Sequence, residues 1–176
     1  MEHFTNETID TLSLPKFEEV ELTPLRSDYK KVIYFNLVLT FLIIGGIAGT
    51  ALYFIEEATR FWIPVAVAYT FLLVISVIVS MISFRNRGFA FRTHDVMYRS
   101  GALVIETTII PYNRVQHVAL HEGIISRKLG LATVEIFTAG GGGSDIKVPG
   151  IEKDHAEKIK QLLVGKILKE ESVDGE

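Results

Sequence analysis

Most of the polar side chains that could do chemistry lie in the second half of this 176-residue sequence. Residues 85–150 contain eight Lys and Arg against five Asp and Glu, although the whole chain carries a net charge of −3. Arginine can bind phosphate through two parallel hydrogen bonds, and a basic residue beside an anionic bilayer adds about 1 kcal/mol of attraction. The candidate contacts with lipid headgroups or with a partner are Arg85, Arg87, Arg92, Arg99, Arg114, Arg127 and Lys128.

A structural role is the alternative for the same cations. Arg85 and Arg87 directly follow an apolar run and could serve only to orient it in a membrane. The more distant cations could pair with Glu106, Glu122 and Glu135 instead of with a ligand. Nucleic-acid binding is not expected, because the positive charge is modest and no recognition module is present.

Three arrangements resemble catalytic or metal sites, and none is expected to act as one. The run Gly140–Asp145 lacks the Lys-Ser or Lys-Thr pair of a phosphate-binding loop. His117 and His121 have helical zinc spacing, but in a strand they would lie about 13 Å apart. Ser126 could join His121 and Asp145 in a hydrolytic triad, yet no nucleophile-elbow motif surrounds it. We therefore expect no catalysis, no cofactor and no metal.

Two long apolar runs precede this region, Val32–Phe54 and Phe61–Phe84. Each is longer than the roughly 20 residues that a helix needs to cross a bilayer. Neither contains a side chain that is charged at neutral pH. The short segment Ile55–Arg60 separates them. The pattern predicts a two-helix transmembrane hairpin over residues 32–84.

The basic residues beside these runs predict their orientation. Arg26, Lys30 and Lys31 come before the first run and Arg85, Arg87 and Arg92 follow the second, whereas the connecting segment offers only Arg60. Positive residues next to a span stay on the cytoplasmic side, so both termini of this multi-pass cell-membrane protein are expected there. Residues 1–31 are too acidic for a secretory signal and are expected to form a cytoplasmic segment.

Small residues recur at helical spacing inside the hairpin. Gly45 and Gly49 lie four residues apart in the first run, as Ser76 and Ser80 do in the second, and Asn36 adds an amide. Small side chains let helices approach closely in lipid, so these residues predict packing within the hairpin. The alternative is that they contact a second copy of the chain or a partner subunit.

After Phe84 the sequence changes to short β-type stretches separated by turn residues. From Glu152 to about Glu171 the apolar residues follow a helical period. We therefore expect a small β barrel or sandwich over residues 85–171, capped by a C-terminal amphipathic helix, with residues 172–176 as a tail. The predicted strands are 88–93, 96–99, 103–110, 114–121, 132–138 and 145–148.

Five motifs in this region resemble a known family. They are Phe89–Thr93, Tyr98–Gly101, Ile110–Gln116, Gly130–Val134 and Thr138–Gly140. In this order and spacing they are similar to the bacterial pleckstrin-homology type 2 (bPH2) family, and the preceding hairpin gives the architecture of YdbS-like membrane proteins. The resemblance implies a pleckstrin-homology (PH)-like fold.

The resemblance says less about function. Some members look like subunits of membrane assemblies beside a companion with several PH-like domains, and others are linked to tolerance of membrane-active antimicrobial peptides. We expect a non-enzymatic subunit or scaffold, with homo-oligomerisation as a further option. The alternatives are an anionic-lipid headgroup binder and a membrane-stress factor. Eukaryotic PH domains often bind phosphoinositides through basic residues in the first hairpin, where this chain has only His94-Asp95.

Overall fold

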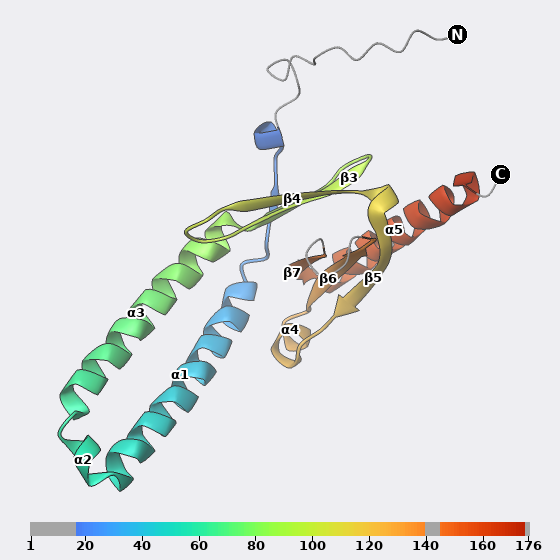
Figure 1. The fold of residues 1–176 in the computed structure, drawn as a ribbon. Coiled ribbons are helices and arrows are strands. Elements are labelled where there is room, and N and C mark those ends of the chain that lie inside the picture. Colours follow the sequence, from blue (N-terminus) through green and yellow to red (C-terminus); the bar gives the residue numbers. More distant parts are fainter. Residues whose placement is uncertain (1–16, 140–144, 175–176) are drawn as a thin grey trace.

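The computed structural model describes residues 17–139 and 145–174, with side chains described up to residue 168. Two long antiparallel helices project from a small β domain (Figure 1). They are α1 (Tyr29–Phe54) and α3 (Trp62–Asn86), joined by the one-turn helix α2 (Glu56–Thr59). Both predicted apolar runs lie inside these helices, apart from Phe61 at the N-terminal end of α3, so the expected hairpin is confirmed.

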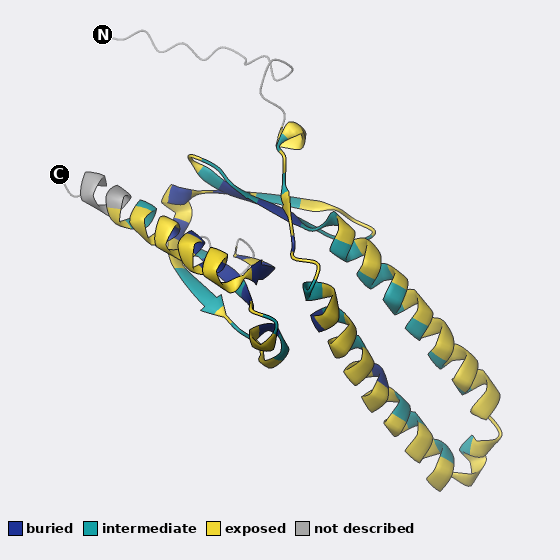
Figure 2. Cartoon of the chain, turned by 180° about the vertical axis from the view of Figure 1, so that it is seen from behind, coloured by how far each residue is buried: buried dark blue, intermediate teal, exposed yellow. Residues whose placement is uncertain are grey.

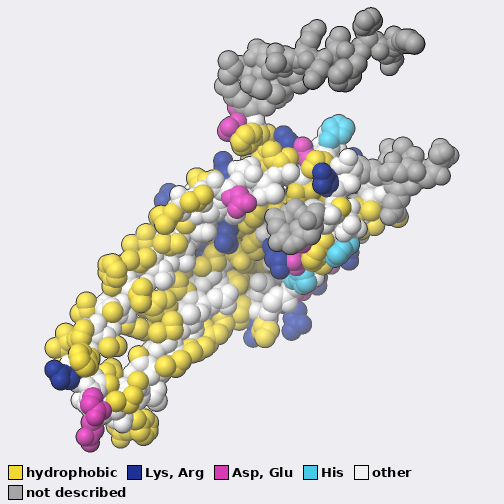
Figure 3. Space-filling model, viewed as in Figure 1, with side chains coloured by type: hydrophobic (Ala, Val, Ile, Leu, Met, Phe, Trp, Pro, Cys, Tyr) yellow, Lys and Arg dark blue, Asp and Glu magenta, His cyan; other side chains and the backbone are white. Residues whose placement is uncertain are grey.

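The hairpin helices are exposed along most of their length (Figure 2). Only Val32 and Phe41 are buried in α1, and no residue of α3 is buried. Both helices are long and apolar enough to cross a membrane. Hydrophobic side chains cover the hairpin in the space-filling view, with charged residues near its two ends (Figure 3). A core helix of a soluble protein would instead bury one face.

The two helices meet around Tyr69. Its hydroxyl donates a hydrogen bond to the Phe41 carbonyl over 2.9 Å, and the two rings lie edge to face with centroids 5.5 Å apart. Gly45 lies under the same ring, because a Cβ added there would be 3.1 Å from the Tyr69 hydroxyl. A Cβ at Gly49 would meet nothing within 4 Å. Of the two glycines, only Gly45 lies at the contact between the helices.

The other small or polar residues singled out in the hairpin lie elsewhere. Asn36 is exposed on α1, whereas Ser76 and Ser80 are partly buried on α3. Neither the packing role nor the partner role of these three residues is decided by their positions.

The β domain consists of two antiparallel sheets that do not close into a barrel in the described residues. The first has the order β1-β2-β3-β4 and the second the order β5-β6-β7. The strands of the first sheet are β1 (Thr23–Pro24), β2 (Gly88–Phe91), β3 (Asp95–Ser100) and β4 (Glu106–Pro111). Those of the second are β5 (Val115–His121), β6 (Leu131–Thr138) and β7 (Ile146–Glu152).

Short helical segments and one long helix complete the fold. They are η2 (Phe17–Glu19), η3 (Tyr112–Arg114), α4 (Ile124–Lys128) and α5 (Lys153–Asp174). The core lies between the two sheets and α5. Val96 and Ile110 come from the first sheet, Val134 and Val148 from the second, and Leu163 from α5. This is the expected PH-like arrangement of a small β domain capped by a C-terminal helix.

The structure differs from the predicted strands in several places. β2 ends at Phe91 instead of residue 93, and β7 continues to Glu152 instead of residue 148. Leu103–Ile105 precede β4 as a loop, so the predicted strand begins at Glu106 instead. The expected loop between β5 and β6 contains α4. Thr23–Pro24, before the hairpin, pair with Gly88–Phe89 after it, which no local pattern predicted.

Candidate functional site

The domain is joined to the start of α1 by packing as well as by the chain. Leu25 is 5% exposed and belongs to the domain core, and Tyr29, in the first turn of α1, packs against that core. Between them, the Arg26 amide donates to the Gly150 carbonyl over 3.0 Å. The Arg26 guanidinium also lies 3.4 Å from the Glu152 carboxylate. The segment before the hairpin is therefore part of the domain.

The domain is joined as closely to the end of α3. Phe84 packs against the same core, and the Asn86 side-chain amide donates to the Gly101 carbonyl over 3.2 Å. Arg87 alone separates α3 from β2. Burial raises the pKa of the Tyr98 hydroxyl, and the nearby Arg87 charge opposes that shift. We call the end of the hairpin where α1 begins and α3 ends its domain end.

An apolar loop lies beside this domain end. Leu103, Val104 and Ile105 are 88%, 80% and 58% exposed. The loop turns at Gly101, whose φ is +121° and where a Cβ would collide with the Val104 carbonyl. The Asn86 bond holds the loop next to the end of α3 (Figure 1). Consecutive exposed apolar residues of this kind mark contacts with a membrane or another protein.

The short helix α4 lies near the start of α1 (Figures 1 and 2) and carries both apolar and basic side chains. Ile124 is 72% exposed, and Arg127 and Lys128 are exposed in the same helix. An apolar residue followed by cations is a composition suited to the boundary between hydrocarbon and headgroups. Of the cations singled out from sequence, Arg127 and Lys128 are neighbours in this helix, Arg85 is exposed in the last turn of α3, and Arg87 is half-buried between α3 and β2.

The remaining three cations lie at separate positions. Arg99 lies within β3 opposite Thr107, and Arg114 is exposed in η3. Arg92 lies at the turn between β2 and β3, which is the end of these strands away from the Gly101 turn. The cations singled out from sequence therefore do not gather at one site.

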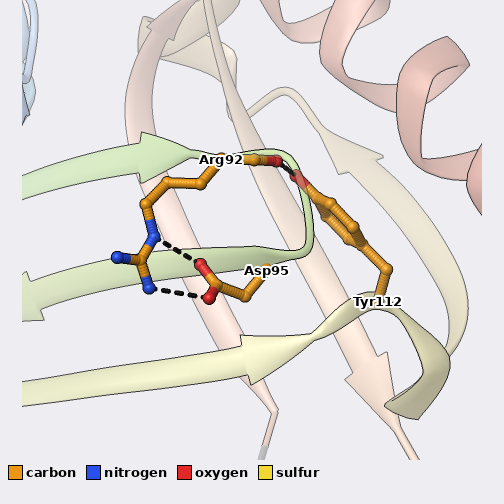
Figure 4. Close-up of polar contacts among 3 residues, drawn as sticks. All are labelled: Arg92, Asp95 and Tyr112. Atoms are coloured by element: carbon orange, nitrogen blue, oxygen red, sulfur yellow. Dashed lines mark hydrogen bonds and ion pairs between the residues drawn. The ribbon is translucent and has the colours of Figure 1, made fainter. Parts of the chain in front are cut away.

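Arg92 is held by neighbouring residues of the domain (Figure 4). Its Nε and Nη2 atoms donate to the two Asp95 carboxylate oxygens over 2.6 and 2.7 Å. The buried Tyr112 hydroxyl donates to the Arg92 carbonyl over 2.7 Å, and burial raises the pKa of that hydroxyl. The Asp95 carboxylate already binds the Arg92 guanidinium through two hydrogen bonds, which is the geometry that a phosphate would need. Arg92 is thus better suited to hold the turn than to bind lipid phosphate.

The acids expected as alternative partners bind other groups. Glu135, largely buried in β6, lies 2.8 Å from Lys147 and 2.7 Å from His121. The hydrogen bond from Lys147 is the main cause that holds the pKa of Glu135 below its usual value. Glu122 lies 3.0 Å from Lys153. None of the ion pairs in the described part of the chain joins these acids to the cations singled out from sequence.

The residues of the triad considered from sequence have separate contacts. His121 binds Glu135, whereas the Asp145 carboxylate accepts a hydrogen bond from the Thr138 amide over 2.8 Å. His117 stacks on Phe137 with ring centroids 4.1 Å apart. Among the described residues, no group of three or more His, Cys, Asp or Glu could hold a metal. Most of the glycine-rich run, residues 140–144, lies outside the described residues.

Sequence reasoning missed two parts of this site. It placed Leu103–Ile105 in a strand, although the preceding Gly101-Ala102 signals a turn. It also treated residues up to Lys31 as a separate segment. The only signal there was Thr-Pro-Leu at residues 23–25, which is too short to predict a strand.

Comparisons with known proteins agree with this architecture. A family model described as bacterial PH domain matches residues 32–166. The chain is 33% identical over 70 residues to the UPF0699 transmembrane protein YdbS of Bacillus subtilis (strain 168). That alignment covers 40% of this chain and 42% of the relative, so the chain spans less than half of the length of the protein it matches. No solved structure gives a significant match.

Proposed function

The chain belongs to the bacterial PH domain family, and from this we propose that it is a non-enzymatic subunit or scaffold of a membrane protein assembly. Its PH-like domain would lie at the cytoplasmic leaflet, because basic residues flank the domain end of the hairpin. The proposed partner is another membrane protein, which can itself carry PH-like domains, or a second copy of this chain.

The observation that carries this proposal is the double attachment of the domain. Tyr29 at the start of α1 and Phe84 at the end of α3 both pack against the domain core. A single residue, Arg87, links α3 to β2. A domain attached in this way keeps one orientation relative to the bilayer, which suits the presentation of a fixed surface to a partner in the membrane. A flexible linker would suffice to keep a domain near the membrane.

The hairpin offers a surface on which such a partner could pack. A shallow, open groove of mostly apolar side chains lies along α3, lined among others by Trp62, Ala66 and Thr70. Small residues at helical spacing beside an aromatic side chain allow a second helix to approach closely in lipid. We include this groove in the proposed contact.

Purification of the tagged full-length chain from its native membranes in a mild detergent tests the proposal. A stoichiometric companion or a stable homo-oligomer is expected, and the double substitution Ala66→Leu and Thr70→Leu should reduce its recovery. Gly46→Leu is the matched control, because it adds bulk on α1 where a Cβ meets nothing within 4 Å. A chain that elutes as a monomer without companions would contradict the proposal.

A second candidate function is direct contact with anionic lipid. The exposure of Leu103, Val104 and Ile105 beside the end of α3 favours it. Insertion of this loop at the bilayer surface would stabilise the bound state by about 25 cal/mol for each Å² of apolar area that leaves contact with water. The loop and α4 would then contact the membrane on either side of the hairpin.

A further inference from the structure

A groove between α1 and α3 at the domain end of the hairpin combines positive charge with an apolar lining. Its volume is about 300 Å³. Lys30 and Tyr34 line it from α1, and Ser80, Phe84 and Arg85 line it from α3. Two cations and two hydroxyls therefore share one cavity at the end of two candidate membrane helices.

The two cations of this groove differ from their basic neighbours in their ion pairs. In the described part of the chain, neither Lys30 nor Arg85 takes part in an ion pair, whereas the neighbouring Arg26 and Lys31 each do. The Lys30 ammonium lies 4.9 Å from the centre of the Phe84 ring. Every described residue that lines the groove is neutral or basic. An anionic group would thus meet two cations and no opposing negative charge.

The remaining lining suits a lipid more than a soluble anion. The apolar side chains of Ile33 and Met81 also line the groove, and Met81 is exposed. An acyl chain can pack on these side chains while the phosphate remains at the groove's basic end. The volume is at the lower limit of ligand pockets, enough for a headgroup but not for a whole lipid.

We propose that this groove binds the headgroup phosphate of an anionic phospholipid. Lys30 and Arg85 contact the phosphate, the Tyr34 and Ser80 hydroxyls donate hydrogen bonds to it, and the acyl chains lie along the hairpin. Basic pockets between membrane helices bind acidic headgroups in this way. The site lies in the hairpin and goes beyond the scaffold role, because it requires neither a companion protein nor the partner groove on α3.

Native mass spectrometry of the full-length protein in a mild detergent tests the site. The probes are phosphatidylglycerol, phosphatidylcholine and inorganic phosphate, each titrated separately. We expect phosphatidylglycerol to bind at least about tenfold more tightly than phosphatidylcholine, and millimolar inorganic phosphate not to displace it. Equal binding of the two lipids would overturn the proposal. Displacement by inorganic phosphate would also overturn it, because the site would then be one for free phosphate.

Variants locate the binding within the chain. The double variant Lys30→Gln, Arg85→Gln should bind phosphatidylglycerol at least about tenfold more weakly, because both basic side chains that attract the headgroup are lost. The charge-keeping variant Lys30→Arg, Arg85→Lys should retain most of the affinity. Arg60→Gln, at the other end of the hairpin, should have no effect. If the double variant fails to fold, Arg85→Gln alone should still weaken binding several-fold. Unchanged affinity in a folded variant that lacks the Lys30 or the Arg85 charge would contradict the site.

Discussion

Tyr29 lies so close to the backbone of Gly150 that a Cβ at Gly150 would be 2.6 Å from the Tyr29 Cγ atom. Tyr29 belongs to the first turn of α1, whereas Gly150 lies in β7. The helix and the sheet therefore touch directly, with no space for a side chain between them. Gly150 also has a φ of +68°, a backbone conformation that other residues adopt at a cost. This contact fixes the domain to the hairpin.

Gly150→Ala should accordingly destabilise the domain. We expect the free energy of unfolding to fall by at least about 1–2 kcal/mol from the left-handed backbone alone, with a further loss from the contact with Tyr29. Thermal unfolding of the full-length protein in detergent measures it. Gly165→Ala is the control, because Gly165 lies in α5 where a Cβ meets nothing within 4 Å. Equal stability of the two variants would show that α1 does not rest on Gly150.

The hairpin glycines should differ from each other in the same way. Gly45→Leu should lower the thermal stability of the detergent-solubilised protein, because the new side chain would displace the Tyr69 ring. Gly49→Leu should leave the stability of the single chain unchanged, since the position is open. If Gly49→Leu instead disrupts an oligomer or releases a companion, the result would show that Gly49 contacts a partner and does not pack within the hairpin.

Leu103 should contact lipid in the full-length protein. The chain has no cysteine, so a single Leu103→Cys substitution gives one labelling site for an environment-sensitive fluorophore. Lipid-attached quenchers should reduce its emission in vesicles containing phosphatidylglycerol. His94→Cys, at an exposed position on the opposite turn of the sheet, should respond only to aqueous quenchers. Aqueous quenching at both positions would place the apolar loop in water.

Acid should remove the contribution of Glu135 to stability. Its pKa is lowered in the folded state from 4.5, mainly by the hydrogen bond from Lys147, so the stabilisation is fully present above that pH. It is lost as the pH falls through the lowered folded-state pKa. The difference in melting temperature between the wild type and Glu135→Gln should therefore be largest at neutral pH and narrow in acid. Glu106→Gln, on an exposed carboxylate of β4, is the control. A difference that is constant with pH would contradict this account.

The hairpin and the core strands were predictable from sequence because their signals are local. Length and apolarity alone define α1 and α3. The apolar stretch Val96, Met97 and Tyr98, buried at all three positions, locates β3 within one residue at each end. The period of Ala156, Ile159 and Leu163 likewise identifies the buried face of α5.

The attachment of the domain was not predictable, because it depends on contacts between distant residues. Thr23 pairs with Phe89 across the whole hairpin, and two residues leave no periodic pattern. Leu103, Val104 and Ile105 have the apolar and β-branched composition of a strand, and the turn signal of Gly101-Ala102 before them does not say where the turn ends. Sequence also could not separate Arg92, which binds Asp95, from cations without such a partner.

The contacts of the N-terminal segment also determine how the domain can be studied. A fragment that begins at Phe89 would lack β1, Gly88 and the buried Leu25. It would expose part of the first sheet and of the core. Lipid and partner binding are therefore best measured on the full chain.

The distance between the two ends of the molecule tests most directly whether the domain is fixed to the hairpin. Spin labels at Glu57→Cys, in α2, and at Lys158→Cys, on the exposed face of α5, can be measured by pulsed electron paramagnetic resonance in lipid nanodiscs. A domain held by Tyr29 and Phe84 should give one narrow distance distribution, which Gly150→Ala should broaden. A broad distribution in the unaltered protein would show that the domain moves freely on the hairpin and would contradict the account.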